Sequence, residues 1–174
     1  MELIERTDWL YGIWLASLVG CTCIIVYTDI AWYWIPDAVV CAVALSNGIG
    51  WLAGLFQPNL WLGMLIAAFF FLAYVWNPNG IGSGDIKLTA ALCLGCTGYM
   101  AYGMTAAACV TALGTACCLR LRAKPAVIPF GPFLWLGWWS AFFMKEEWQA
   151  WLLLGSSIPE PMGIFCGNCC WFAL

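Results

Sequence analysis

Long apolar runs, separated by short polar breaks, make up most of this 174-residue chain. Charges, prolines and Gly/Asn breaks bound six apolar segments, at residues 9–28, 37–56, 60–76, 85–98, 102–119 and 127–144. A membrane-spanning helix needs about 20 mostly apolar residues, and its backbone polar groups must be bonded internally. The pattern therefore predicts an all-α polytopic membrane protein with about six transmembrane helices.

The stretch 85–119 fits either one overlong helix or two helices broken near Gly98 to Gly103. Two helices would bring 29–36, 77–85 and 120–126 to one side of the membrane. That side would then collect four of the six basic residues, which are Lys87, Arg120, Arg122 and Lys124. Because cytoplasmic loops carry an excess of Lys and Arg, we expect two helices and expect this side to be cytoplasmic.

Composition supports a chain whose solvent is the bilayer. Hydrophobic residues make up 64% of the sequence, charged residues make up 9%, and the mean hydropathy is +0.89. The net charge of -3 gives no reason to expect nucleic acid as a partner. Since the N-terminus lacks the features of a secretory signal, we expect the first apolar run to be retained. We expect one membrane-embedded domain over 1–174, with a core of about 10–144 and with 145–174 as an interfacial tail or a broken seventh span.

The eleven cysteines do not form a recognisable metal motif. Most lie inside apolar runs, where a thiol acts as a small packing group. Cys93 and Cys96 have C-x-x-C spacing, but the chain has no histidine and no second pair nearby, so we expect neither a zinc site nor any other cofactor. The role of Cys166, Cys169 and Cys170 stays open.

Three aspartates lie at the ends of segments on the inferred cytoplasmic side: Asp29, Asp37 and Asp85. A carboxylate at membrane depth costs about 2.5–3.5 kcal/mol on insertion scales and points to function. Each one alone fits a helix cap or an interfacial charge. As a pair, Asp29 and Asp85 could share a proton, one acting as base on a water and the other as acid toward a carbonyl. Gly82 and Gly84 before Asp85 would allow close approach of a substrate backbone.

Three motifs, in chain order, carry a family resemblance. They are Asp29 followed six residues later by Ile35-Pro36-Asp37; Gly82-Ser83-Gly84-Asp85-Ile86-Lys87-Leu88; and Ile128-Pro129-Phe130-Gly131-Pro132-Phe133-Leu134. In these motifs the chain resembles the prepilin peptidases, or type IV leader peptidases, which are Gly-x-Gly-Asp membrane aspartic peptidases. The resemblance covers about 10–144.

The resemblance implies an endopeptidase of the bacterial cytoplasmic membrane. It would cut the basic leader from type IV prepilins and pseudopilins after a glycine, at the cytoplasmic face. Asp29 and Asp85 match the catalytic pair. The residues that would shape the site or bind substrate are Ile35, Pro36, Asp37, Gly82, Gly84, Lys87, Pro129, Phe130, Gly131 and Pro132. Longer members also carry an N-terminal cytoplasmic domain with paired C-x-x-C motifs and methylate the product. Since about nine residues precede the first span here, methyltransferase activity is not expected.

Three other classes of protein fit the sequence less well. Presenilin-like intramembrane proteases also use Gly-x-Gly-Asp, but the Ile-Pro-Asp continuation after Asp29 is foreign to them. A small transporter with intramembrane acids would usually hold them near the midplane between inverted repeats, whereas these acids lie at segment ends. A purely structural membrane subunit would not explain three motifs at one face. The substrate and the oligomeric state are not determined by the sequence.

Overall fold

The computed structural model describes residues 2–76, 81–121 and 128–144 and is all-α over these ranges, which confirms the all-α part of the predicted fold class. The six helices are α1 (Glu2–Trp32), α2 (Asp37–Leu52), α3 (Leu60–Trp76), α4 (Ser83–Cys93), α5 (Met100–Leu121) and α6 (Gly131–Phe143). An isolated bridge between Pro58 and Thr97 is the β pairing found in the described part of the chain. The predictions about 145–174, including its three cysteines, fall outside the described residues, as do Arg122 and Lys124.

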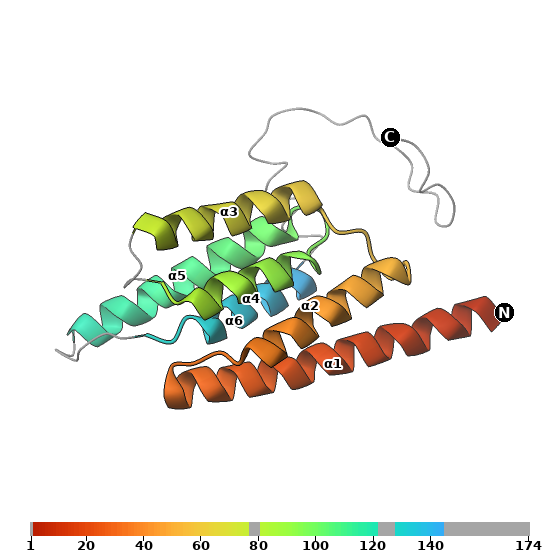
Figure 1. The fold of residues 1–174 in the computed structure, drawn as a ribbon, viewed down its shortest axis with the longest axis horizontal. Helices are drawn as coiled ribbons and strands as arrows, with labels where there is room; N and C mark the ends of the chain where they lie inside the picture. The colour runs from red at the N-terminus through yellow and green to blue at the C-terminus, as the bar shows by residue number, and fades with distance from the viewer. Residues whose placement is uncertain (1, 77–80, 122–127, 145–174) are drawn as a thin grey trace.

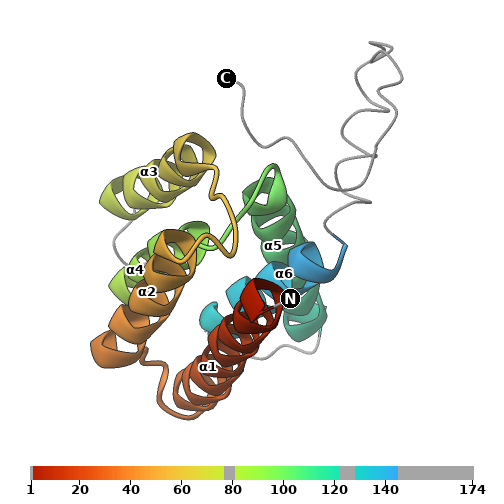
Figure 2. The same ribbon diagram turned by 90° about the vertical axis from the view of Figure 1, so that its right-hand side faces the viewer.

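Successive helices run back and forth along the long axis of the molecule (Figure 1). In chain order, α1 packs on α2, α3 on α4, and α5 on α6, while α2–α4, α3–α5 and α1–α6 contacts link these pairs (Figure 2). The turn after α1, the start of α4 and the start of α6 therefore lie at one end of the bundle (Figure 1). Segments more than 100 residues apart meet at this end.

Among the residues that the structure describes, two helices are both long and apolar enough to cross a membrane: Trp9–Trp32 within α1 and Met100–Leu119 within α5. The helices α2 and α3, with 16 and 17 residues, are shorter apolar helices. At a rise of 1.5 Å per residue, the 11 residues of α4 extend only about 16 Å, roughly half of a hydrocarbon core. The expectation of six full-length spans is thus supported for two helices.

Several helix ends differ from the predicted ones. The first helix continues past residue 28 to Trp32, so Asp29 is inside it. The fourth apolar segment forms a helix only as far as Cys93, and the chain then turns through Gly98, whose φ of +50° suits glycine. This turn confirms that 85–119 forms two helices. Gly103, which was the far limit of the predicted break, lies within α5.

Small residues allow the closest helix contacts. A Cβ atom added to Gly137 in α6 would collide with the Met104 carbonyl of α5 and lie 3.2 Å from the Ala108 Cβ. Likewise, a Cβ on Gly63 in α3 would lie 3.1 Å from the Cys93 Cβ in α4. Because lipid tails are as apolar as the side chains, this kind of close backbone approach is a main source of attraction between helices in membranes.

A buried polar group joins three helices in the half of the bundle away from the carboxylates. Asn47 of α2 is fully buried; its Oδ1 accepts a hydrogen bond from Trp14 Nε1 at 3.1 Å, and its Nδ2 donates to the Ala91 carbonyl at 2.9 Å. Buried amides are costly unless bonded, so this satisfied group fixes how α1, α2 and α4 align.

Candidate active site

Asp29 is buried within the last turn of α1, with 5% of its surface exposed. Its Oδ2 accepts a hydrogen bond of 2.9 Å from the backbone N–H of Gly131, the first residue of α6. A helix N-terminus presents free N–H groups and a partial positive charge, so the start of α6 favours an anionic Asp29. The first and third motifs thus meet through a direct contact across 102 positions of sequence.

Gly131 has to be a glycine for this contact. A Cβ atom at position 131 would lie 2.8 Å from Asp29 Oδ2 and 3.2 Å from Ile35 Cδ1. Real Cβ atoms essentially never come within 3.0 Å of such a neighbour, so any side chain here would displace the carboxylate.

Asp85 lies in the first turn of α4, which begins after Gly82. Its backbone N–H donates to the Gly82 carbonyl at 3.1 Å. A Cβ at Gly82 would lie 3.1 Å from Asp85 Oδ2, so the small residue lets the carboxylate fold back over the turn.

The two aspartates line the same small cavity, of about 210 Å³. Each carboxylate also faces the first turn of a helix, α6 for Asp29 and α4 for Asp85, which offsets part of the cost of a negative charge. The structure therefore brings together the two residues that the sequence pairs.

Ile35 holds the three motifs together. Its side chain is buried, and a Cβ added to Gly84 would lie 3.1 Å from the Ile35 Cβ. Since a Cβ at Gly131 would also touch Ile35, this one side chain occupies the space left by a glycine from each of the other two motifs. Pro36 follows as the N-cap of α2, and its carbonyl accepts hydrogen bonds from the N–H groups of Val39 and Val40.

The turn between Asp29 and Ile35 uses an unusual backbone conformation. Tyr33 has φ of +53°, in the left-handed region that non-glycine residues seldom adopt. Its N–H donates to the Asp29 carbonyl at 3.0 Å, which completes the last turn of α1. A left-handed residue commonly ends a helix, and here it redirects the chain so that Ile35 points back under the aspartates.

Asp37 and Lys87 form an ion pair at the edge of the cavity. Lys87 Nζ lies 2.8 Å from Asp37 Oδ1, and both side chains are exposed, at 54% and 69% for Lys87 and Asp37. Exposed pairs of this kind contribute only about 0–1 kcal/mol. In this structure the ammonium group of Lys87 therefore bonds to Asp37 rather than to either of the paired aspartates.

The remaining predicted residues play different parts. Pro129, Phe130 and Pro132 do not line the cavity. Phe130 is the N-cap of α6, with its ring 6.0 Å from that of Phe70, and Pro132 lies in the first turn, so both position Gly131. Three further cavity residues, Tyr33, Trp34 and Ser83, were not singled out from the sequence. Their positions inside the first and second motifs were the available signal.

Among the residues that the structure describes, no group of three or more His, Cys, Asp or Glu side chains is placed to hold a metal ion. The described side chains of the cavity offer carboxylates that can transfer protons, and the Ser83 and Tyr33 residues of its lining add hydroxyl groups.

Fold and site define an all-helical protein with two membrane-length helices and a pair of carboxylates in a cavity at one end of its bundle. The chain belongs to the type IV leader peptidase family, whose model matches residues 16–117. The matched range contains the first two motifs, and the third lies beyond it. The protein is thus a membrane-associated protease of the leader peptidase kind. Searches of curated proteins and of solved structures found no significant match.

Proposed function

We propose that this protein is an aspartic endopeptidase that removes the leader from type IV prepilins or pseudopilins, with Asp29 and Asp85 as the catalytic pair. The observation that carries the proposal is their placement in one cavity of about 210 Å³, each at the first turn of a helix. Family membership supports peptidase activity, and this geometry supports the aspartic type.

The chemistry follows from two carboxylates that share one proton. The ionised member takes a proton from a water molecule, which attacks the carbonyl carbon of the scissile peptide bond. The protonated member donates to the carbonyl oxygen, so a gem-diol forms without a free oxyanion. Proton transfer to the leaving nitrogen then breaks the C–N bond and releases the new N-terminus. The Gly131 N–H, bonded to Asp29 Oδ2, orients the carboxylate during these transfers.

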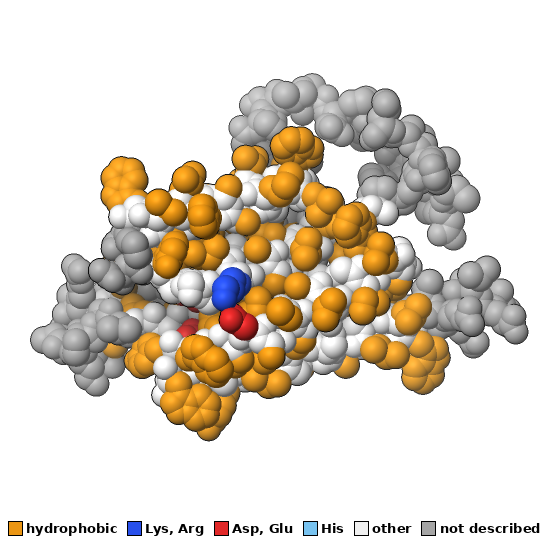
Figure 3. All heavy atoms as spheres, viewed as in Figure 1, with side chains coloured by type: hydrophobic (Ala, Val, Ile, Leu, Met, Phe, Trp, Pro, Cys, Tyr) orange, Lys and Arg blue, Asp and Glu red, His pale blue; other side chains and the backbone are white. Residues whose placement is uncertain are grey.

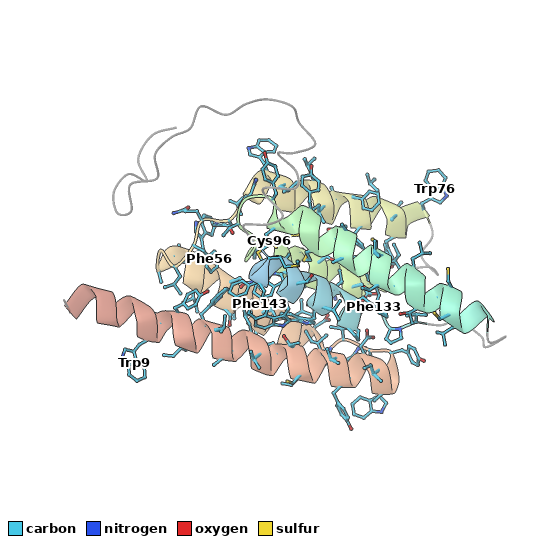
Figure 4. All side chains as sticks on the ribbon, turned by 180° about the vertical axis from the view of Figure 1, so that it is seen from behind. Trp9, Phe56, Trp76, Cys96, Phe133 and Phe143 are labelled. Atoms are coloured by element: carbon cyan, nitrogen blue, oxygen red, sulfur yellow. The ribbon has the colours of Figure 1, made fainter. Side chains whose placement is uncertain are left out.

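For location, we propose that the bundle spans the bacterial cytoplasmic membrane and that the carboxylate end faces the cytoplasm. Exposed tryptophans support a membrane orientation along the bundle axis, since Trp9 lies near one end and Trp76 near the other (Figure 4). Two more are exposed at helix ends, Trp32 at the end of α1 and Trp61 at the start of α3. The basic residues predicted on the carboxylate side support the cytoplasmic assignment. In this scheme the shorter helices form spans together with the long ones.

The test is cleavage of a purified prepilin in detergent, followed by N-terminal sequencing of the product. We expect cleavage after a glycine by the wild type and loss of turnover in both Asp29→Asn and Asp85→Asn. Asparagine has nearly the shape of aspartate, and in Asp29→Asn it keeps an acceptor oxygen for the Gly131 N–H, so the variants should stay folded.

Asp37→Asn is the matched control, because it removes a carboxylate that is exposed and paired only at the cavity edge. It should retain most of the wild-type kcat, because both members of the pair stay in place. A folded Asp85→Asn protein that cleaves nearly as fast as the wild type would reject the catalytic pair. Cleavage elsewhere than after the glycine would reject the proposed specificity.

A further inference from the structure

A second and larger hollow lies beside the proposed active site. It is an apolar groove of about 590 Å³ between α2 and α3, with α4 as its floor. Its walls are rich in small side chains, which include Cys41, Ala44, Gly63, Ala67, Ala90 and Ala91. The mechanism proposed above uses none of these residues.

The groove is continuous with the carboxylate cavity. Asp37 and Lys87 line both spaces, and their ion pair stands where the two meet. Figure 3 shows this pair as the contacting blue and red side chains on a face of hydrophobic and uncharged groups. Because Lys87 follows Asp85 by two residues in α4, the groove begins about 3 Å along the helix axis from the catalytic position.

The dimensions fit a helix. On α2 the lining runs from Asp37 to Ala44, a span of eight residues whose seven rises of 1.5 Å give roughly 10 Å, which matches two turns of a docked helix. The small side chains would let the backbone of that helix come close, as helix pairs in membranes require. The exposed Met64 and Leu60 at the α3 wall provide apolar contact.

We infer that this groove binds the apolar helix of the substrate, with the helix lying between α2 and α3 and the preceding peptide bond beside Asp29 and Asp85. The inference rests on the proposed function. The apolar wall matches a hydrophobic helix, while the acidic end formed by the three aspartates matches a basic leader. Since the groove ends where the cavity begins, the bond just before the helix reaches the carboxylates without unwinding the helix.

The ion pair at the junction is suited to admit such a substrate. An exposed pair contributes about 0–1 kcal/mol, so separating Asp37 from Lys87 costs little. The freed Asp37 carboxylate can then face the basic leader as the chain passes from groove to cavity.

A native cysteine allows a direct test. Cys41 is exposed and lines the groove, whereas Cys23 on α1 and Cys109 on α5 are exposed but lie outside it. The probe is a peptide with a basic leader, a glycine and an apolar helix that carries one cysteine in its first two turns. Three Asp85→Asn proteins, each retaining one of these three cysteines, are mixed with the probe under mild oxidation. We expect disulfide formation at Cys41 and little at the other two.

A kinetic test uses the full set of native cysteines. Ala67→Trp should fill the groove and raise the KM for the full-length probe roughly tenfold, equivalent to about 1.4 kcal/mol, with a much smaller change for a peptide that lacks the apolar helix. Val110→Trp, on the exposed face of α5, is the matched control and should change neither.

The outcomes separate the two proposals. If the wild type cleaves neither peptide, the proposed function fails. If the wild type cleaves both peptides, two results would reject the groove assignment alone. One is cross-linking that favours Cys23 or Cys109 over Cys41, and the other is an unchanged KM of Ala67→Trp for the full-length probe. In that case the groove is filled by lipid chains or by a second copy of the protein.

Discussion

Replacement of Gly131 by alanine tests how the third motif serves the site. The new Cβ would lie 2.8 Å from Asp29 Oδ2 and 3.2 Å from Ile35 Cδ1. The carboxylate must then move away, which breaks or lengthens the 2.9 Å hydrogen bond from the residue 131 N–H. Loss of a hydrogen bond to a charged group costs about 1.5–3 kcal/mol, and displacement of a reacting group by about 1 Å costs on the order of 10²-fold in rate.

We therefore expect Gly131→Ala to lower kcat for prepilin cleavage by roughly 100-fold while the protein still folds, with a lower thermal midpoint in detergent. Gly20→Ala is the matched control, because nothing lies within 4 Å of a Cβ built at that α1 position. Alanine in a helix interior is favoured over glycine by about 0.5–1 kcal/mol, so this control should be at least as stable as the wild type.

A double variant separates strain from misplacement. Ile35→Val removes the Cδ1 atom, the second of the two groups that an alanine at 131 would meet. Added to Gly131→Ala, it should recover part of the stability but not the rate, since the contact with Asp29 persists. A Gly131→Ala enzyme with wild-type kcat and midpoint would refute the argument that this glycine positions the carboxylate.

Three further predictions follow from the same structure. The rate should fall at low pH, where both carboxylates are protonated, and at high pH, where both are ionised. A pH profile of kcat should therefore yield two apparent pKa values that belong to the pair, and a pH-independent rate would contradict a shared proton. Asn47→Leu should lower unfolding stability by about 1–3 kcal/mol, because it leaves the Trp14 Nε1–H without its partner; an unchanged thermal midpoint would contradict this. Single cysteines at Ser83 and Arg122 should react with impermeant reagents from the same, cytoplasmic side of the membrane, and labelling from opposite sides would remove the predicted topology.

The number and order of the helices could be predicted from the sequence because prolines, glycines and charges interrupt the apolar runs. The ends of the helices could not, since they depend on distant contacts. Asp29 was expected after the first helix, because a carboxylate at membrane depth is costly. It lies inside α1, where the N–H of Gly131 compensates its burial. Similarly, α4 stops early as the chain turns at Gly95, which packs against the Asn47 amide.

The residues of the site could be predicted from the three motifs, but the contacts between the motifs could not. The aspartates share a cavity, as their pairing in sequence suggested, and Gly84, the glycine next to Asp85, does allow a close approach. The approaching group is Ile35 of the same chain, however, not only a substrate backbone. Lys87 was expected to shape the site, and it does line the cavity of the two aspartates, but its ammonium group bonds to Asp37, which lies 50 residues away in sequence. A motif of a few neighbouring residues cannot reveal an ion pair between residues so far apart in sequence.

These contacts make the three motifs one packing unit rather than three independent signals. Ile35 fills the space that Gly84 and Gly131 leave open, and Gly131 in turn bonds to Asp29. A side chain added at either glycine must push Ile35, and a push on Ile35 is transmitted to the turn at Tyr33, which already holds a left-handed backbone. The turn cannot move without moving the last turn of α1, because the Tyr33 N–H bonds to the Asp29 carbonyl. Substitutions in any one motif should therefore couple energetically to the other two, although the residues lie up to 102 positions apart.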